Sequence, residues 1–250
     1  MTLKINNLTG EKLDVLIEGN LQAKTTVIFV HGFAVDKHET AGYFDDLVIV
    51  FGNNYRIIRF DFSGCGESEG NLEEKDYEKW ADDLKIVVDY VKKTYKGSLY
   101  IFAQSMGCFV IALANPTGIK KTIFTGIPNN NTQLIIDRIS KRFLSRPGGS
   151  INYEGISYFP RSTGKVQEIG PTFWKVLKDF NPYKTVEKYS KKTNLFIIHP
   201  KQDEIVGSEF LEEYSMIPKI RIEWIDGDHS FTKKEDRENL IVKIKDFFGQ

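Results

Sequence analysis

The sequence predicts an α/β protein with a mostly parallel sheet of about eight strands and helices on both of its faces. Two observations predict this class. Short apolar runs rich in Val, Ile and Phe alternate along the chain with segments of helical periodicity, as strands and crossover helices do in a parallel sheet. The length of 250 residues suits one large domain of this kind.

The elements follow in chain order. The first 20 residues predict an antiparallel hairpin with its turn near Thr9 and Gly10. Buried strands are predicted from six apolar runs: 25–31, 55–60, 98–103, 121–125, 194–199 and 219–225. Residues 72–95 and the C-terminal segment around 240–248 place apolar side chains on one helical face. Residues 105–114 are apolar nearly all round, which predicts a helix packed deep against the sheet.

One segment interrupts this alternation. Residues 127–185 combine Pro, Gly and Asn with many aromatic side chains and are too long for a simple loop. We expect a cap insertion over the sheet, after the sixth strand, with short helices or a hairpin of its own. The core of the single domain would then consist of residues 1–126 and 186–250.

Composition excludes several classes of function. Lys plus Arg and Asp plus Glu number 34 each, so nothing indicates a nucleic-acid partner. No stretch approaches the ~20 apolar residues of a membrane span, and no signal peptide is apparent, so a cytoplasmic location is expected. Cys65 and Cys108 form neither a disulfide framework nor a metal-ligand spacing. We expect no metal and no cofactor; a homo-oligomer stays open, without support from any sequence feature.

The strongest indication of chemistry is the pentapeptide Ala103-Gln104-Ser105-Met106-Gly107, which ends a predicted strand and opens a predicted helix. A serine between small residues at such a junction sits on a tight turn that exposes its hydroxyl at the edge of the sheet. The N-terminus of the following helix adds free N–H groups and the positive end of a dipole. Ser105 is therefore the candidate nucleophile.

Four further loops follow predicted strands. They are His31-Gly32-Phe33, the run 61–68 (DFSGCGES), the run 199–206 (HPKQDEIV) and the run 227–231 (GDHSF). The run 61–68 lacks the third glycine of a dinucleotide fingerprint. Among four histidines, only His229 lies after the candidate acids of 199–206 and before the last helix.

Together these motifs resemble the α/β-hydrolase fold superfamily, and within it small microbial esterases, monoacylglycerol-lipase-like hydrolases and cinnamoyl or feruloyl esterases. The resemblance implies a triad of Ser105, Asp203 and His229 in the chain order usual for this fold. Glu204, Asp226 and Asp228 compete with Asp203 for the role of acid. Two residues depart from the usual pattern, Ala103 and Pro200, which both stand where glycine is common.

The resemblance also assigns supporting groups. It implies an oxyanion hole from the backbone N–H groups of Phe33 and Met106. Gly32 and Gly107 would allow the tight turns, and His31 would hydrogen-bond loop backbone instead of acting as the base.

The function that follows is a serine hydrolase, of carboxylesterase or lipase-like type, acting on a small-molecule ester with a short or medium acyl or aryl group through an acyl-Ser105 intermediate. Two alternatives stay open: an acyl thioesterase or acyltransferase with the same triad, and a non-catalytic ligand-binding member of the fold. Residues 127–185 contain more Lys and Arg than Asp and Glu. That excess indicates either a solvated basic face or attraction for an anionic substrate such as a carrier-linked thioester.

Overall fold

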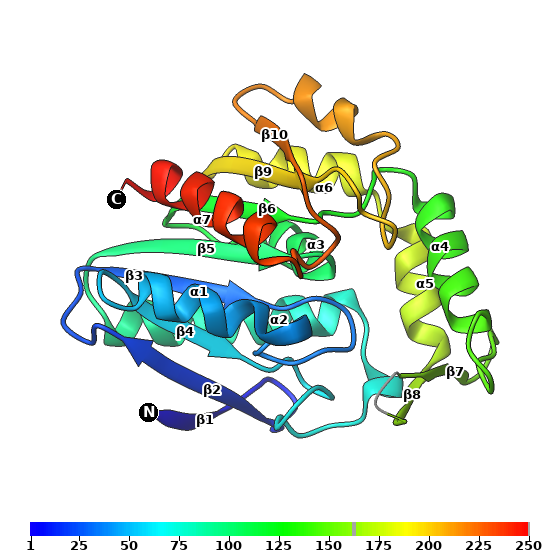
Figure 1. Ribbon diagram of the computed structural model, residues 1–250. Coiled ribbons are helices and arrows are strands. Elements are labelled where there is room, and N and C mark those ends of the chain that lie inside the picture. The colour runs from blue at the N-terminus through cyan, green and yellow to red at the C-terminus, as the bar shows by residue number, and fades with distance from the viewer. Residues whose placement is uncertain (162–163, 250) are drawn as a thin grey trace.

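The computed structural model describes residues 1–161 and 164–249. The strands of its main sheet are β1 (Thr2–Asn6), β2 (Lys12–Gly19), β3 (Thr25–Val30), β4 (Arg56–Phe60), β5 (Ser98–Gln104), β6 (Ile119–Thr125), β9 (Asn194–Pro200) and β10 (Arg221–Ile225). They lie in the order β1-β2-β4-β3-β5-β6-β9-β10. β2 pairs antiparallel with β1 and β4, and all other neighbours are parallel. The predicted sheet and its N-terminal hairpin are confirmed (Figure 1).

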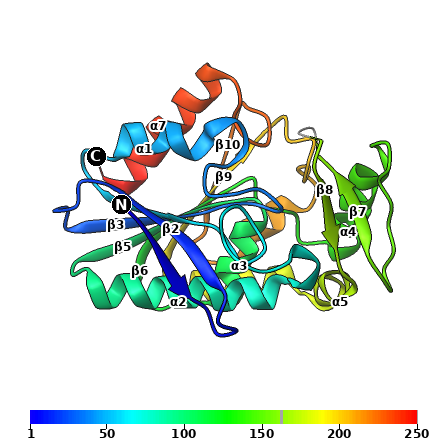
Figure 2. The same ribbon diagram turned by 90° about the horizontal axis from the view of Figure 1, so that it is seen from below.

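Helices cover both faces of this sheet. The α-helices are α1 (Tyr43–Phe51), α2 (Tyr77–Thr94), α3 (Met106–Ala114), α4 (Thr132–Leu144), α5 (Pro171–Asp179), α6 (Pro182–Ser190) and α7 (Lys234–Phe248). Short 3-10 helices are η1 (Thr40–Gly42), η2 (Leu72–Glu74) and η3 (Leu211–Met216). Figure 2 shows α1 and α7 on one face and α2 and α3 on the other. Each face has its own buried apolar cluster, so the strands are apolar on both sides. Within the described residues, no helix is long and apolar enough to cross a membrane.

The carboxyl ends of the parallel strands meet at one edge of the sheet. The loops that follow β3, β5, β6, β9 and β10 therefore start close together, although they are far apart in sequence. This edge is where open α/β sheets bind ligands. It gathers the five loops that hold His31, Ser105, Gly126, Asp203 and His229.

A second group of elements lies beyond this edge. It consists of α4, α5 and a two-stranded antiparallel sheet of β7 (Ser157–Pro160) and β8 (Val166–Ile169), and Figure 1 shows it beside the strand ends. Stacked aromatic rings join these elements, with Phe143 of α4 and Phe159 of β7 4.2 Å apart at their centroids. Phe173 of α5 packs on Phe33 at 5.0 Å, which attaches the group to the β3 loop.

Candidate active site

Ser105 lies on a strained turn between β5 and α3. Its φ of 55° and ψ of −124° place it in a region that L-residues rarely adopt. A backbone hydrogen bond from Ser105 N to Thr125 O, 2.9 Å long, ties the turn to the next strand. The side chain is nearly buried but lines a pocket. Its hydroxyl makes no hydrogen bond with any described residue, so a serine–histidine hydrogen bond is not formed in this structure.

Close backbone approach explains the glycine after this serine. A Cβ added to Gly107 would lie 2.7 Å from the carbonyl oxygens of both Val30 and His31, at the end of β3. Helix α3 and strand β3 therefore approach closely only with glycine here. Ala103, on the other side of the serine, is fully buried and fits with its methyl group. The turn needs small residues on both sides of Ser105, and alanine meets that need.

Asp203 and His229 meet across the loops after β9 and β10. His229 Nδ1 lies 2.7 Å from Asp203 Oδ2. The other carboxylate oxygen, Asp203 Oδ1, accepts the N–H groups of Ile205 and Val206 at 2.9 and 3.0 Å. Burial raises the pKa of Asp203, but the charge of His229 and these hydrogen bonds outweigh it and leave the pKa below its ordinary value. The carboxylate is thus held ionised and oriented toward the imidazole ring.

The competing acids lie elsewhere. Asp228 accepts the N–H groups of Ser230 and Thr232 and so holds its own loop. Asp226 is solvent-exposed and contacts Lys201 at 3.4 Å. Glu204 lines the pocket without a hydrogen bond to any described residue. Of the four candidates, only Asp203 lies within hydrogen-bond distance of His229.

The loop after β3 presents free backbone donors. Neither Phe33 N–H nor Met106 N–H donates a hydrogen bond within the described part of the chain, and both residues line the pocket with Ser105. His31 is fully buried; its Nε2 accepts from Phe62 N at 3.1 Å, and its Nδ1 lies 2.8 Å from Gly32 O. An Nε2 that accepts places the ring proton on Nδ1, so His31 is a neutral support for the loop.

Two residues that the sequence did not single out complete the site. The Gln104 side chain donates from Nε2 to His229 O at 2.6 Å and accepts from Thr125 Oγ1 at 2.5 Å. It thereby links the serine turn to the histidine loop. Glu39 has a φ of 60°, and its Oε1 accepts Gly32 N at 2.5 Å. Neither contact could be read from the sequence: the Gln104 contact joins two loops that are distant in the chain, and the Glu39 contact depends on the irregular backbone of the segment after β3.

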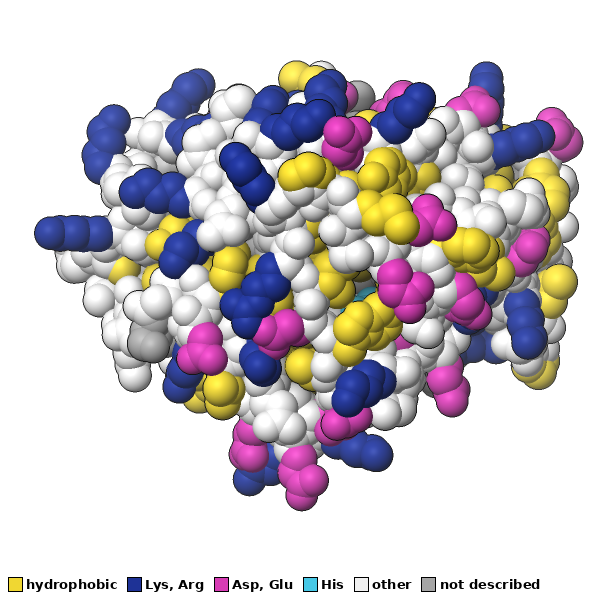
Figure 3. All heavy atoms as spheres, turned by 90° about the horizontal axis from the view of Figure 1, so that it is seen from above, with side chains coloured by type: hydrophobic (Ala, Val, Ile, Leu, Met, Phe, Trp, Pro, Cys, Tyr) yellow, Lys and Arg dark blue, Asp and Glu magenta, His cyan; other side chains and the backbone are white. Residues whose placement is uncertain are grey.

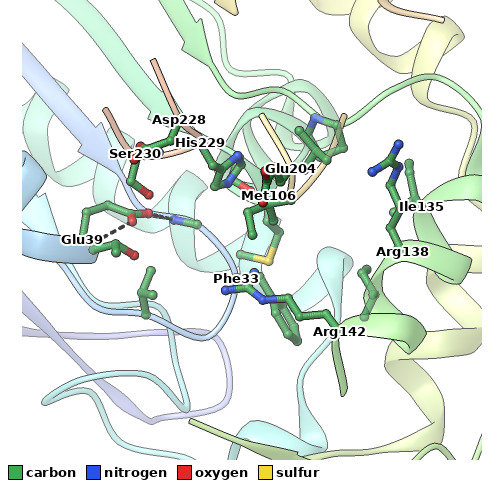
Figure 4. Close-up of a pocket in the computed structure, with 18 of the residues that line it drawn as sticks. Phe33, Glu39, Met106, Ile135, Arg138, Arg142, Glu204, Asp228, His229 and Ser230 are labelled. Carbon is green, nitrogen blue, oxygen red and sulfur yellow. Dashed lines mark hydrogen bonds between the residues drawn. The ribbon is translucent and has the colours of Figure 1, made fainter. Parts of the chain in front are cut away.

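One cavity of about 490 Å³ is lined by Ser105, His229, Phe33, Met106 and Glu39, and its volume is within the usual range for small-molecule sites. Figure 4 shows Met106 between His229 and Phe33, with Glu39, Asp228 and Ser230 on one side. Arg138, Arg142 and Ile135 of α4 line the other side. In the space-filling view, hydrophobic side chains gather among charged ones and a histidine shows at the bottom of a recess (Figure 3). Within residues 1–161 and 164–249, no group of three or more His, Cys, Asp or Glu could hold a metal ion.

A second buried histidine lies beside the acid. His199, at the end of β9, is fully buried, and its Nε2 is 3.8 Å from Asp203 Oδ2. The Trp224 ring packs edge-on against it at 5.1 Å. Burial lowers the pKa of His199 to about 4, although the Asp203 charge opposes this shift. His199 is therefore neutral in the folded protein near pH 7.

This burial predicts acid sensitivity of the fold. Between pH 6.5 and 4 the unfolded chain protonates His199 while the folded protein does not, so the free energy of unfolding falls as pH falls through this window. The loss should approach about 3 kcal/mol at the lower end. Urea unfolding at several pH values gives the free energy of unfolding as a function of pH. Its fall between pH 6.5 and 4 should be smaller for His199→Gln than for wild type. His38→Gln, at an exposed histidine, is the control and should behave as wild type. An equal fall in the free energy of unfolding for His199→Gln and wild type would contradict the prediction.

The fold and the strand-end loops define the class. The chain has the α/β-hydrolase fold, as the resemblance of its motifs led us to expect. The family model described as serine aminopeptidase, S33, matches residues 22–127. That match includes the loop of Gly32 and the turn of Ser105, but neither Asp203 nor His229.

Two solved structures and one further sequence are also similar to this chain. The structure of the esterase Est1E from Butyrivibrio proteoclasticus with ferulic acid bound superposes with a TM-score of 0.76, at 20% identity over 98% of this chain and 97% of that one. The structure of a Pyrococcus furiosus esterase superposes with a TM-score of 0.73, at 21% identity over 99% of this chain and 89% of that one. In sequence, 117 residues are 32% identical to the mitochondrial palmitoyl-protein thioesterase ABHD10 of Bos taurus. This match spans 45% of the chain and only 37% of that relative's length.

Proposed function

We propose that the protein is a serine hydrolase that cleaves carboxylic esters with short to medium acyl or aryl groups through an acyl-Ser105 intermediate. One observation carries the proposal: His229, whose Nδ1 lies 2.7 Å from Asp203 Oδ2, lines the same pocket as the strained Ser105 turn. A serine hydroxyl is a poor nucleophile at neutral pH and needs an oriented base. The esterase neighbours support the choice of substrate.

The chemistry has two halves. Ser105 Oγ attacks the ester carbonyl carbon while His229 Nε2 takes the hydroxyl proton, and Phe33 N–H and Met106 N–H donate to the oxyanion. The bond from carbon to the leaving oxygen breaks as His229 returns the proton to the departing alcohol. Water then attacks the acyl-serine with the same base, which releases the carboxylic acid and restores Ser105.

A second candidate is a thioesterase. The palmitoyl-protein thioesterase similar over 117 residues favours it, and the same acyl-serine chemistry would serve with a thiol as leaving group. The pocket does not separate the two, because it is lined by both apolar and charged side chains. We place the oxoester first because the structural neighbours that align over nearly the whole chain include several esterases.

The test is a series of p-nitrophenyl esters from acetate to palmitate, run beside octanoyl-CoA. We expect hydrolysis of the oxoesters with a maximum at short to medium chains. The stacked rings of Phe143 and Phe159 line the pocket that would hold the acyl group. Faster turnover of the thioester would move the function to the second candidate. No turnover of either, with no labelling of Ser105 by a fluorophosphonate, would indicate a ligand-binding protein that keeps the triad unused.

A further inference from the structure

Three arginines gather around one phenylalanine on the α4 side of the pocket. The guanidinium carbons of Arg142, Arg146 and Arg161 lie 5.6, 5.4 and 5.0 Å from the centre of the Phe159 ring. Contact with the ring face favours each cation. Three like charges around one ring also repel one another, and that repulsion grows as water is excluded.

None of these guanidinium groups forms a direct ion pair with a described residue, and the carboxylates of Asp203 and Glu39 act on Arg142 and Arg161 only from a longer range. Within residues 1–161 and 164–249, no carboxylate oxygen lies within 4.0 Å of any of the three, whereas Arg138 pairs with Glu209. Burial, with the charges of Arg161 and Arg146, lowers the pKa of Arg142 to about 10. Burial and Arg146 likewise lower the pKa of Arg161. The cluster thus holds partly desolvated cations whose charge an external anion would balance.

Two of the three arginines face the candidate active site. Arg142 and Arg161 line the same pocket as Ser105 and His229, and Arg146 does not. Arg146 instead donates to Pro160 O at 2.8 Å. In Figure 4 the Arg142 side chain reaches from α4 into the pocket toward Phe33. Two guanidinium groups are therefore available to a molecule bound at Ser105.

The acidic side chains of the pocket are placed differently. Glu39 and Asp228 line it on the side away from α4 and both accept backbone hydrogen bonds (Figure 4). Glu204 lies near His229 in the same view. The cavity is therefore divided, with carboxylates beside the triad and free guanidinium groups along α4 and after β7. Such a division orients a substrate whose charge is at one end.

We infer that the substrate carries an anionic group, a carboxylate or a phosphate, at the end remote from its scissile ester bond, and that Arg142 and Arg161 bind this group. The inference rests on the proposed function and narrows its substrate class. Guanidinium groups suit both anions because their planar N–H donors match pairs of oxygen atoms. The stacked rings of Phe143 and Phe159 would contact the apolar chain between the two ends.

The test compares three p-nitrophenyl esters of equal chain length: octanoate, hydrogen suberate and ω-phosphonooctanoate. We expect kcat/KM to be about tenfold or more higher for a charged ester than for octanoate. In 0.5 M NaCl the ratio of the two kcat/KM values should fall toward one, because charges are then screened within roughly 4 Å. The better of the two charged esters identifies the anion as carboxylate or phosphate.

Variants assign the effect to the two arginines. Arg142→Gln and Arg161→Gln should each lower the ratio of charged to neutral kcat/KM by about tenfold, the value of one lost charge-assisted interaction. Arg146→Gln is the matched control, since it removes the same charge beside the same ring but outside the pocket, and it should keep the ratio. A ratio near one in wild type, or an equal fall in Arg146→Gln, would overturn the inference.

Direct binding separates this inference from the proposed hydrolysis. Calorimetric titration of Ser105→Ala with monomethyl suberate and with octyl phosphate should show saturable binding of one of them, weakened about tenfold or more by adding Arg142→Gln. Hydrolysis of octanoate without such binding would refute the anion site and leave the esterase. Binding without hydrolysis of any ester would support the anion site and refute the esterase.

Discussion

Replacing Ser105 with alanine is expected to lower kcat for ester hydrolysis by about a millionfold, the largest effect of any single change in this protein. The reason is that, among the described residues that line the pocket, no other hydroxyl lies on a strained turn at the N-terminus of a buried helix. Without the nucleophile, neither an acyl intermediate nor labelling by a fluorophosphonate can occur. Stopped assays with p-nitrophenyl butyrate and mass spectrometry of the labelled protein measure both losses.

The fold should survive this change. The Ser105 hydroxyl makes no hydrogen bond to a described residue, and alanine keeps the Cβ that fits the turn. The free energy of unfolding should change by about 1 kcal/mol or less, so the melting temperature should stay within a few degrees of wild type. Ser230→Ala is the matched control, because Ser230 also lines the pocket beside His229. Ser105→Ala protein with full activity would remove the assignment of the nucleophile.

The local sequence was sufficient to predict those features of the site that depend only on residues close together in the chain. The strand-to-helix turn of Ser105 needs an apolar strand, small flanking residues and an apolar helix, all within 98–114. Sheet geometry then brings the loops after parallel strands to one edge. The choice of Asp203 and His229 among the side chains at that edge came from the resemblance of the motifs to α/β-hydrolases, and the structure places the two 2.7 Å apart.

Contacts between distant loops could not be foreseen in this way. Gln104 reaches His229 only because the two loops fold together, and glutamine inside the turn has no distinctive spacing. The cluster of arginines around Phe159 also depends on contacts between distant segments. Arg142 lies on α4 and Arg161 follows β7, and the stacking of Phe143 on Phe159 brings them to one ring. The sequence showed the positive excess of residues 127–185, but it did not show which cations face the pocket.

Replacing Asp203 with asparagine is the second change with a very large expected effect, a loss of about 10⁴-fold in kcat. The contacts of the carboxylate explain why an isosteric amide fails. Oδ1 accepts the N–H groups of Ile205 and Val206, and Oδ2 accepts from His229. An asparagine would keep its carbonyl oxygen toward the two backbone donors, because its NH₂ group cannot accept from them. Its NH₂ group would then face His229 Nδ1.

That arrangement selects the wrong tautomer of the base. With a donor at Nδ1, the imidazole proton moves to Nε2, and Nε2 can no longer take the proton of Ser105. The fold should be retained, since both backbone hydrogen bonds persist, so circular dichroism should match wild type while kcat falls. Asp228→Asn and Glu204→Gln remove the same type of charge near the pocket, and each should lower kcat by less than about tenfold. If Asp203→Asn kept its activity while Asp228→Asn lost it, the 2.7 Å contact would be structural, and the acid that orients His229 would have to be sought in the histidine loop itself.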